Sequence, residues 1–211
     1  MFETDRSLQA VHSGTVMRKG ERTREQVIEQ AAALFNQRGY HGASISDIMQ
    51  ATGLKKGGIY RHFSSKEELA VAAFRLATER MAERFREALA GKTSALEQVR
   101  AIMSVFERIP HDPPVPGGCP MLNVTVDADD GNPELLAEAR QVMNGLKRLL
   151  RAILREGQRQ AELRASLDAD ATSHVIIAQL EGAVMLCRLY GSRAPMRDAI
   201  AHLEDWLKQL Q

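Results

Sequence analysis

The chain has 211 residues, 44% hydrophobic and 26% charged, which is enough for one large or two small domains with a buried core. No stretch reaches the roughly 18 consecutive apolar residues of a membrane helix, and the N-terminal segment lacks the apolar centre of a signal peptide. These features, and only two cysteines, predict a cytoplasmic protein without a membrane partner or a disulfide framework. The net charge is +1, but residues 1–67 hold ten Lys and Arg against seven Asp and Glu, a net +3. A basic excess of this size is only weak evidence for nucleic acid.

Residues 1–20 are expected to form a flexible N-terminal arm. The first helix is predicted to start behind Thr23, because Gln26 three residues later completes a capping-box pattern. Gly39 marks its C-terminal end. The apolar residues between these signals recur at helical spacing: Val27, Ile28, Ala31, Leu34 and Phe35.

Two short helices follow. Ser44 and Asp47 form an acidic start signal for the first, which is predicted to end at Gly53, where a tight turn needs a left-handed residue. The second passes through Ile59. Two short helices joined by a glycine-containing turn and packed on a third helix form a helix-turn-helix, here assigned to residues 21–67.

The remaining residues, 68–211, are also predicted to be helical. Ser64 or Ser65 opens a long helix toward Ala90, and a loop dense in proline and glycine follows the next helix. The later helices are expected at 94–109, 119–128, 133–161, 169–190 and 194–210. No strand alternation and no internal repeat occur, so the fold class is all-α with about nine helices.

The segment GLKKGGIY, residues 53–60, combines two features that weaken a helix. Gly57 and Gly58 are poor helix formers, and Lys55 and Lys56 at a helix N-terminus oppose the helix dipole. Both features suit a DNA-reading helix, because bare backbone allows close approach and the lysines can bind phosphate. Tyr60 adds a hydroxyl one turn later. A flexible loop start with two solvated lysines is the alternative; a phosphate-binding P-loop is disfavoured because the lysines precede the glycines and no strand is predicted.

The segment from Thr23 to Phe74 closely resembles the DNA-binding domain of the TetR family of transcriptional regulators. The positions typical of that family are Phe35, Gly39, Tyr40, Ile48, Gly53, Gly57, Tyr60, His62, Phe63, Lys66 and Leu69. The resemblance implies a homodimer that binds a double-stranded DNA operator, usually as a repressor. It also implies that residues 68–211 bind a small-molecule effector and form the dimer. No enzymatic activity is expected.

The resemblance also assigns roles to single residues. Ser44 and Tyr60 are expected at phosphates, and so is Lys66 at the start of the connecting helix. Ser46, Lys56 and Gly58 are assigned to the base-facing surface. Many relatives have a small hydroxyl residue in place of Lys55 and Thr or Ser in place of Gly58, so fewer side chains are left here to contact bases. Base specificity is therefore expected to rest more on Ser46, Lys55 and Lys56.

The last two helices carry apolar residues suited to a four-helix dimer interface. The residues predicted to lie in it are Val175, Leu186, Met196, Ile200, Leu203 and Leu207. An intrachain core is the alternative for these side chains. Flexible or aromatic apolar residues are predicted to line the effector pocket: Met103, Phe106, Cys119, Met121, Leu122, Met143, Leu146 and Met185. Most of them could equally be ordinary core.

Neither a metal nor a cofactor is predicted, because the six histidines and two cysteines show no tight ligand spacing and no catalytic motif is present. Cys119 precedes Pro120 and is therefore expected at a helix N-cap, where a lowered thiol pKa would make it an oxidant or electrophile sensor. A small buried residue at the pocket mouth is the alternative. A helical binding protein or enzyme with a merely structural front domain remains the second function class.

Overall fold

The computed structural model describes residues 18–127 and 132–211, which contain nine helices and no strand. In chain order the helices are α1 (Lys19–Gly42), α2 (Ile45–Thr52), α3 (Lys56–Tyr60), α4 (Lys66–Leu89), α5 (Ala95–Arg108), α6 (Pro120–Asp127), α7 (Pro133–Arg159), α8 (Ala169–Tyr190) and α9 (Ala194–Gln209). The all-α prediction is confirmed. Within these residues no helix is both long and apolar enough to cross a membrane.

The first helix starts earlier than predicted. It begins at Lys19, where the backbone N–H of Arg18 donates to the Glu21 carboxylate at 2.8 Å, one turn before the expected cap. The Thr23 hydroxyl instead donates to the Lys19 carbonyl at 2.9 Å. The arm predicted at residues 1–20 is therefore helical at its last two positions, and residues 1–17 lie outside the described part.

Local signals set the boundaries of α2 and α4 correctly. The Ser44 hydroxyl accepts from the backbone N–H of Asp47 at 3.1 Å, and Gly53 ends α2 in the left-handed conformation with φ +70°. Ser65, not Ser64, caps α4, because its hydroxyl accepts from the N–H of Glu68 at 3.2 Å. These bonds satisfy backbone donors that the helix itself leaves free.

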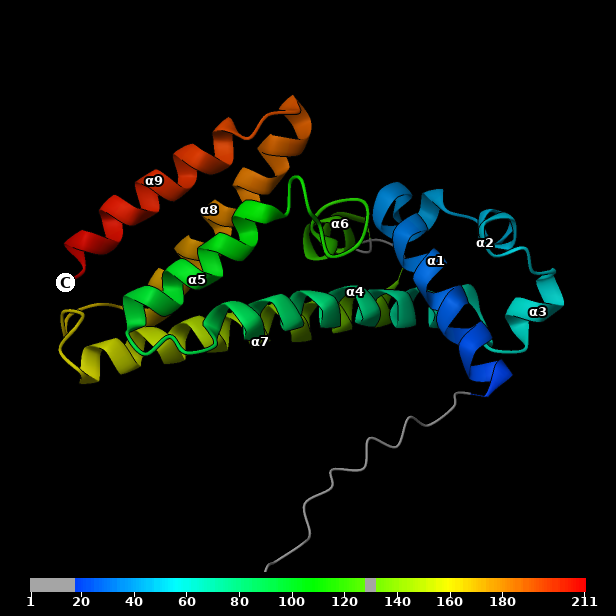
Figure 1. Ribbon diagram of the computed structural model, residues 1–211, viewed down its shortest axis with the longest axis horizontal. Helices are drawn as coiled ribbons and strands as arrows, with labels where there is room; N and C mark the ends of the chain where they lie inside the picture. The colour runs from blue at the N-terminus through cyan, green and yellow to red at the C-terminus, as the bar shows by residue number, and fades with distance from the viewer. Residues whose placement is uncertain (1–17, 128–131) are drawn as a thin grey trace, which may run out of the picture.

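The head of the molecule is the compact unit of α1, α2 and α3 at one end of α4 (Figure 1). Its buried core comprises Val27, Ile28, Ala31, Ala32, Ile48, Ile59, Phe63, Leu69, Ala73, Ala77 and Val115. Three of these residues belong to α4, which runs without a break across the predicted domain boundary at 67/68. The head is thus joined to the rest of the chain by a continuous helix.

The second core fills the space between α4, α5, α7, α8 and α9 at the other end of the molecule, and α6 lies between this core and the head (Figure 1). Met196, Leu203 and Leu207 are 1%, 0% and 0% exposed here, so their assignment to a dimer interface is wrong. The reason is geometric: α9 has one apolar stripe, and packing against α8 and α5 buries these three residues of it, while Ile200 stays half-buried.

A polar network around the buried Asn36 ties the head to the second core. The Asn36 amide nitrogen in α1 donates to the carbonyls of Pro116 and Gly118 at 3.0 and 3.1 Å. The Asn123 amide in α6 donates to the Asn36 side-chain oxygen at 2.8 Å, and Arg188 at the end of α8 donates to the Asn123 oxygen at 2.7 Å. One chain of hydrogen bonds therefore connects α1, the loop before α6, α6 and α8.

Replacing Gly117 by alanine should destabilise the protein strongly, because a Cβ there would lie 2.4 Å from the Asn36 carbonyl oxygen and the residue has φ +116°. We expect Gly117→Ala to lower the free energy of unfolding by about 2–5 kcal/mol, measured by urea denaturation.

Gly91→Ala is the matched control. Gly91 has φ +72° but open space around its Cβ direction, so only the backbone penalty of roughly 1–2 kcal/mol applies. If both variants lose the same free energy of unfolding, the close contact with Asn36 does not contribute to the effect of Gly117→Ala.

Candidate functional site

The α3 helix presents a basic, glycine-containing surface to solvent. Ile59 anchors it in the head core and is 1% exposed, while Lys55, Lys56 and Gly57 are exposed and the Tyr60 side chain is 39% exposed. The Lys56 ammonium lies 5.8 Å from the centre of the Tyr60 ring. We call Ser46, Lys55, Lys56, Gly57 and Tyr60 the reading face, since all five are exposed on α2, on α3 or at the α3 N-cap.

The positive charge of the reading face is available to a ligand. Among residues 18–127 and 132–211, neither Lys55 nor Lys56 forms an ion pair with a carboxylate, whereas Arg38 in the same head pairs with Asp47 at 2.8 Å. Two exposed, unneutralised lysines at the start of a helix suit phosphate binding.

Gly57 has no structural reason to be glycine. A Cβ there would meet nothing within 4 Å, and its φ lies outside the left-handed region. Gly53, in contrast, needs its left-handed φ of +70°, and a Cβ on the half-buried Gly58 would contact Leu54 at 3.6 Å. The fold therefore does not explain this glycine, and the bare backbone at Gly57 leaves room for close approach from outside.

Two predicted phosphate contacts are used inside the protein. The Ser44 hydroxyl donates to Asp47 at 2.6 Å and its backbone N–H donates to the same carboxylate at 2.8 Å. The Lys66 ammonium donates to the Tyr40 carbonyl at 2.5 Å and lies 4.3 Å from the Tyr40 ring centre. Burial lowers the pKa of Lys66. Ser44 thus caps α2 through a neighbour three residues away, as its sequence pattern predicts. Lys66 bonds a residue 26 positions away, a role that no local motif reveals.

A small, partly enclosed cavity, which we call the inner cavity, lies between α4, α5, α6, α7 and α8, with a volume of about 40 Å³. Five predicted pocket residues line it: Phe106, Cys119, Met121, Met143 and Leu146. Three predictions fail. Met103 is buried in the core elsewhere, and Leu122 and Met185 line a groove open to solvent, with Met185 49% exposed. Thr78, Met81, Phe85, Val142 and Glu181 also line the cavity and were not predicted.

Glu181 carries a sequence signal that could have placed it. It is the one charged residue in a mostly apolar stretch of α8, residues 175–187. Its Oε1 accepts a hydrogen bond from the Cys119 thiol at 3.1 Å, and its Oε2 is buried without a hydrogen-bond partner among the described residues. Among residues 18–127 and 132–211, no three His, Cys, Asp or Glu side chains gather as a metal site would require.

The expected low pKa of Cys119 is wrong. Burial raises the pKa of its thiol well above the usual range, and the neighbouring Glu181 carboxylate raises it further. The backbone amides of Leu122 and Met121 at the start of α6 do lower the pKa, as an N-cap position predicts, but their effect is smaller. Cys119 is 1% exposed, so it is a packed thiol in this structure.

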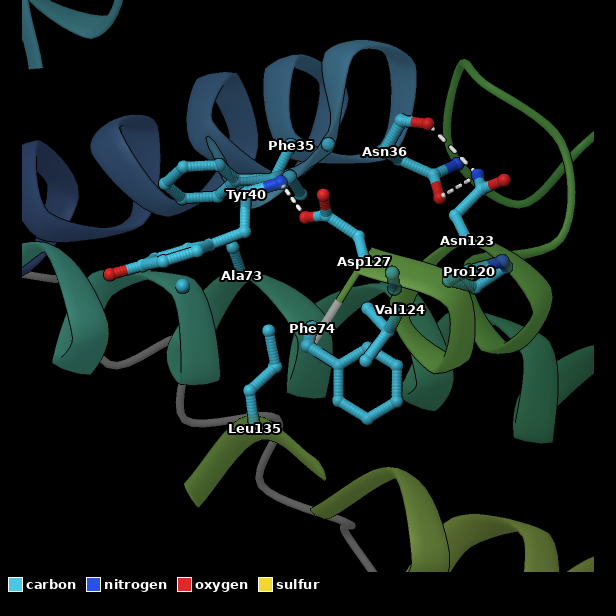
Figure 2. Close-up of a pocket in the computed structure, with 14 residues that line it drawn as sticks. Phe35, Asn36, Tyr40, Ala73, Phe74, Pro120, Asn123, Val124, Asp127 and Leu135 are labelled. Atoms are coloured by element: carbon cyan, nitrogen blue, oxygen red, sulfur yellow. Dashed lines mark hydrogen bonds between the residues drawn. The ribbon is translucent and has the colours of Figure 1, made fainter. Parts of the chain in front are cut away.

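A second cavity, of about 30 Å³, lies where α1, α4 and α6 meet (Figure 2). In Figure 2 Asp127 points from α6 toward the Tyr40 backbone, whose N–H donates to its carboxylate. Pro120 lines this cavity and also the one beside Glu181. The α6 helix therefore contacts both the inner cavity and the head that carries the reading face.

Comparison with known proteins gives consistent matches along the chain. Residues 27–73 match the family model described as bacterial regulatory proteins, tetR family, and residues 95–203 match the tetracyclin repressor-like C-terminal domain. A crystal structure of a TetR transcriptional regulator from Chloroflexus aurantiacus J-10-FL is 47% identical, covers 92% of this chain and 98% of that chain, and superposes with a TM-score of 0.89.

Two curated relatives are more distant. The fatty acid metabolism regulator protein of Bacillus subtilis is 26% identical over 160 residues, covering 75% of this chain and 80% of the relative. The HTH-type transcriptional repressor DhaR of Mycobacterium sp. strain GP1 is 25% identical over 179 residues, covering 82% and 86%.

Gly57→Ala should separate folding from ligand binding at the reading face. Because the added methyl group meets no protein atom, the free energy of unfolding should stay the same or rise by up to about 1 kcal/mol. Affinity for DNA should fall by about tenfold, since the methyl group separates the backbone from the duplex. Denaturation and a DNA mobility-shift titration measure the two effects.

Gly145→Ala provides the control, because Gly145 lies within α7 and a Cβ there would come no closer than 3.9 Å to Arg148. Its free energy of unfolding should change by no more than about 1 kcal/mol, the difference in helix propensity between glycine and alanine. Its affinity for DNA should equal that of the wild type. Unchanged DNA affinity in Gly57→Ala would remove Gly57 from the reading face.

Cys119 should react slowly with iodoacetamide at neutral pH in the folded protein, since its thiol is buried and its pKa is raised. Mass spectrometry should find neither Cys119 nor Cys187 modified until urea unfolds the chain. Rapid, selective labelling of Cys119 in the folded protein would restore the sensor hypothesis.

Proposed function

The chain belongs to the TetR family of transcriptional regulators and is a DNA-binding regulator, and we propose that it acts as a repressor that binds a palindromic operator as a homodimer and is released by a small-molecule effector. The observation that carries this proposal is the reading face, an exposed basic surface with a glycine that the fold itself does not require. Its proposed place of action is the cytoplasm. The repressor direction is supported by the relative named as a repressor.

The proposed dimer surface is an apolar stripe along α8. Val175 is 48% exposed, Met185 49% and Leu189 69%, and these positions share one helix face with the half-buried Leu186. Gly182 lies between them, and a Cβ there would meet no atom within 4 Å. An exposed apolar stripe with a central glycine allows the same helix of a second subunit to approach closely. Ile200, half-buried on α9, extends this surface in the proposal.

Release of DNA is proposed to run through α6. This helix starts beside the inner cavity at Pro120 and ends at Asp127, which binds the Tyr40 backbone in the head. A ligand that widens the inner cavity displaces the start of α6. Because Asn123 and Asp127 are hydrogen-bonded to α1, a shift of α6 changes the position of the head.

The proposal is tested by sequencing genomic DNA fragments that the purified protein retains. We expect one palindromic sequence, bound by two subunits, with an affinity that falls steeply with salt because several phosphate contacts release counterions. Met185→Glu should yield folded monomers by light scattering and lose most operator affinity, since a charge on the stripe opposes association while the side chain is half exposed.

The matched control is Ala152→Glu at an exposed position of α7, which should remain dimeric and bind as the wild type does. A wild-type monomer at micromolar concentration would refute the dimer. Failure to retain any DNA would favour the second class of function, a helical small-molecule-binding protein or enzyme with a structural front domain.

A further inference from the structure

The inner cavity contains one charged side chain whose hydrogen bonding is incomplete. Glu181 has one oxygen bonded to the Cys119 thiol at 3.1 Å, while the other oxygen is buried without a partner among the described residues. Leaving a buried carboxylate oxygen unsatisfied costs free energy, so its presence calls for an explanation. Burial raises the pKa of this carboxyl, in accord with the apolar surroundings.

The other polar groups around the cavity already donate their hydrogen bonds to protein atoms, so they can offer a ligand acceptors but no free donors. The Thr78 hydroxyl donates to the Phe74 carbonyl at 3.0 Å, which leaves its oxygen as an acceptor. The amides of Met121 and Leu122 are directed to the Cys119 sulfur. No Lys, Arg or His is among the residues that line the cavity. The cavity is therefore complementary to a ligand that brings hydrogen-bond donors or positive charge.

The apolar part of the cavity suits such a ligand as well. The rings of Phe85 and Phe106 both line it, with their centres 5.9 Å apart, and aromatic faces attract cations. Met81, Met121 and Met143 also line the cavity. Methionine side chains adapt their shape readily, so the cavity of about 40 Å³ can widen around a larger molecule.

From this arrangement we propose that the effector is an amphiphilic organic cation, with an ammonium or amidinium head group held by the Glu181 carboxylate and an apolar body among the phenylalanine and methionine side chains. The inference rests on the proposed function, in which this cavity is the effector site. The Thr78 oxygen is the second acceptor for the head group. Glu181 lies one turn before Met185 on α8 and is bonded to Cys119, the residue directly before α6. The charged group of the effector is therefore held beside both the proposed dimer helix and the start of α6.

Three probes with one apolar body and different head groups test the charge preference: phenylbutylammonium, phenylbutanol and phenylbutyrate. Calorimetric titration of the full chain should show the ammonium binding at least about tenfold more tightly than the alcohol or the carboxylate, as a buried counter-ion and two aromatic rings predict. The ammonium should also release retained DNA at lower concentration than the other two probes.

Glu181→Gln keeps the shape of the side chain and removes its charge, so it should abolish the preference for the ammonium while the variant remains folded by circular dichroism. Glu107→Gln makes the same change at an exposed position of α5 and should keep the preference. Equal binding of the ammonium and the alcohol to the wild type, or an unchanged preference in Glu181→Gln, would overturn the inference. Tighter binding of phenylbutyrate would do so too, by indicating a protonated Glu181 that donates to an acceptor.

Retention of DNA is measured independently of cation binding, so failure of the cation site can be distinguished from failure of the proposed function. A protein that retains DNA but shows no charge preference refutes the cation site and leaves the proposed repressor function intact. A protein that prefers the ammonium but retains no DNA supports the cation site and refutes the repressor.

Discussion

The buried side chain of Asn36 holds the two parts of the molecule in register. Its amide nitrogen bonds to the loop before α6, and its side-chain and backbone oxygens accept from Asn123 at 2.8 and 2.9 Å. Each of these groups would be costly to bury alone, so the arrangement is stable only when α1, the loop and α6 are all in place. Because Gly117 and Gly118 have no side chains, the loop can pass this close to α1 and to Arg188. The orientation of the head, and with it the reading face, depends on this one cluster.

Charge is distributed in a way that separates the two proposed functions of the chain. The reading face carries lysines without carboxylate partners at the outer surface, where water lowers the cost of an unpaired charge. The inner cavity carries one carboxylate in apolar surroundings, where the same lack of a partner is expensive. Asp170, in contrast, is shared between the cations of Lys147 and Arg151. At both the reading face and the inner cavity, a ligand is proposed to supply the missing partner.

Local signals predicted much of the fold, and distant contacts decided the rest. The Ser44 and Asp47 cap, the left-handed Gly53 and the Ser65 cap depend on neighbours within a few residues, so the sequence reveals them directly. The role of Lys66 depends on Tyr40, 26 residues away, and the pKa of Cys119 depends on Glu181, 62 residues away. The apolar stripe of α9 was visible in the sequence, but not which surface would cover it. The cavity residues that were not predicted lie mainly on α4, α7 and α8. Which side of each helix faces the cavity depends on how the helices are rotated against one another, and no local sequence pattern specifies that rotation.

Pro120, the first residue of α6, lines two small cavities, of about 40 and 30 Å³. Protein interiors resist compression, but small unfilled spaces are the part of a structure that hydrostatic pressure removes first. The Pro120 ring borders both cavities, so a displacement of this ring into one cavity enlarges the other. The start of α6 therefore has room to shift while the well-packed helices around it stay folded.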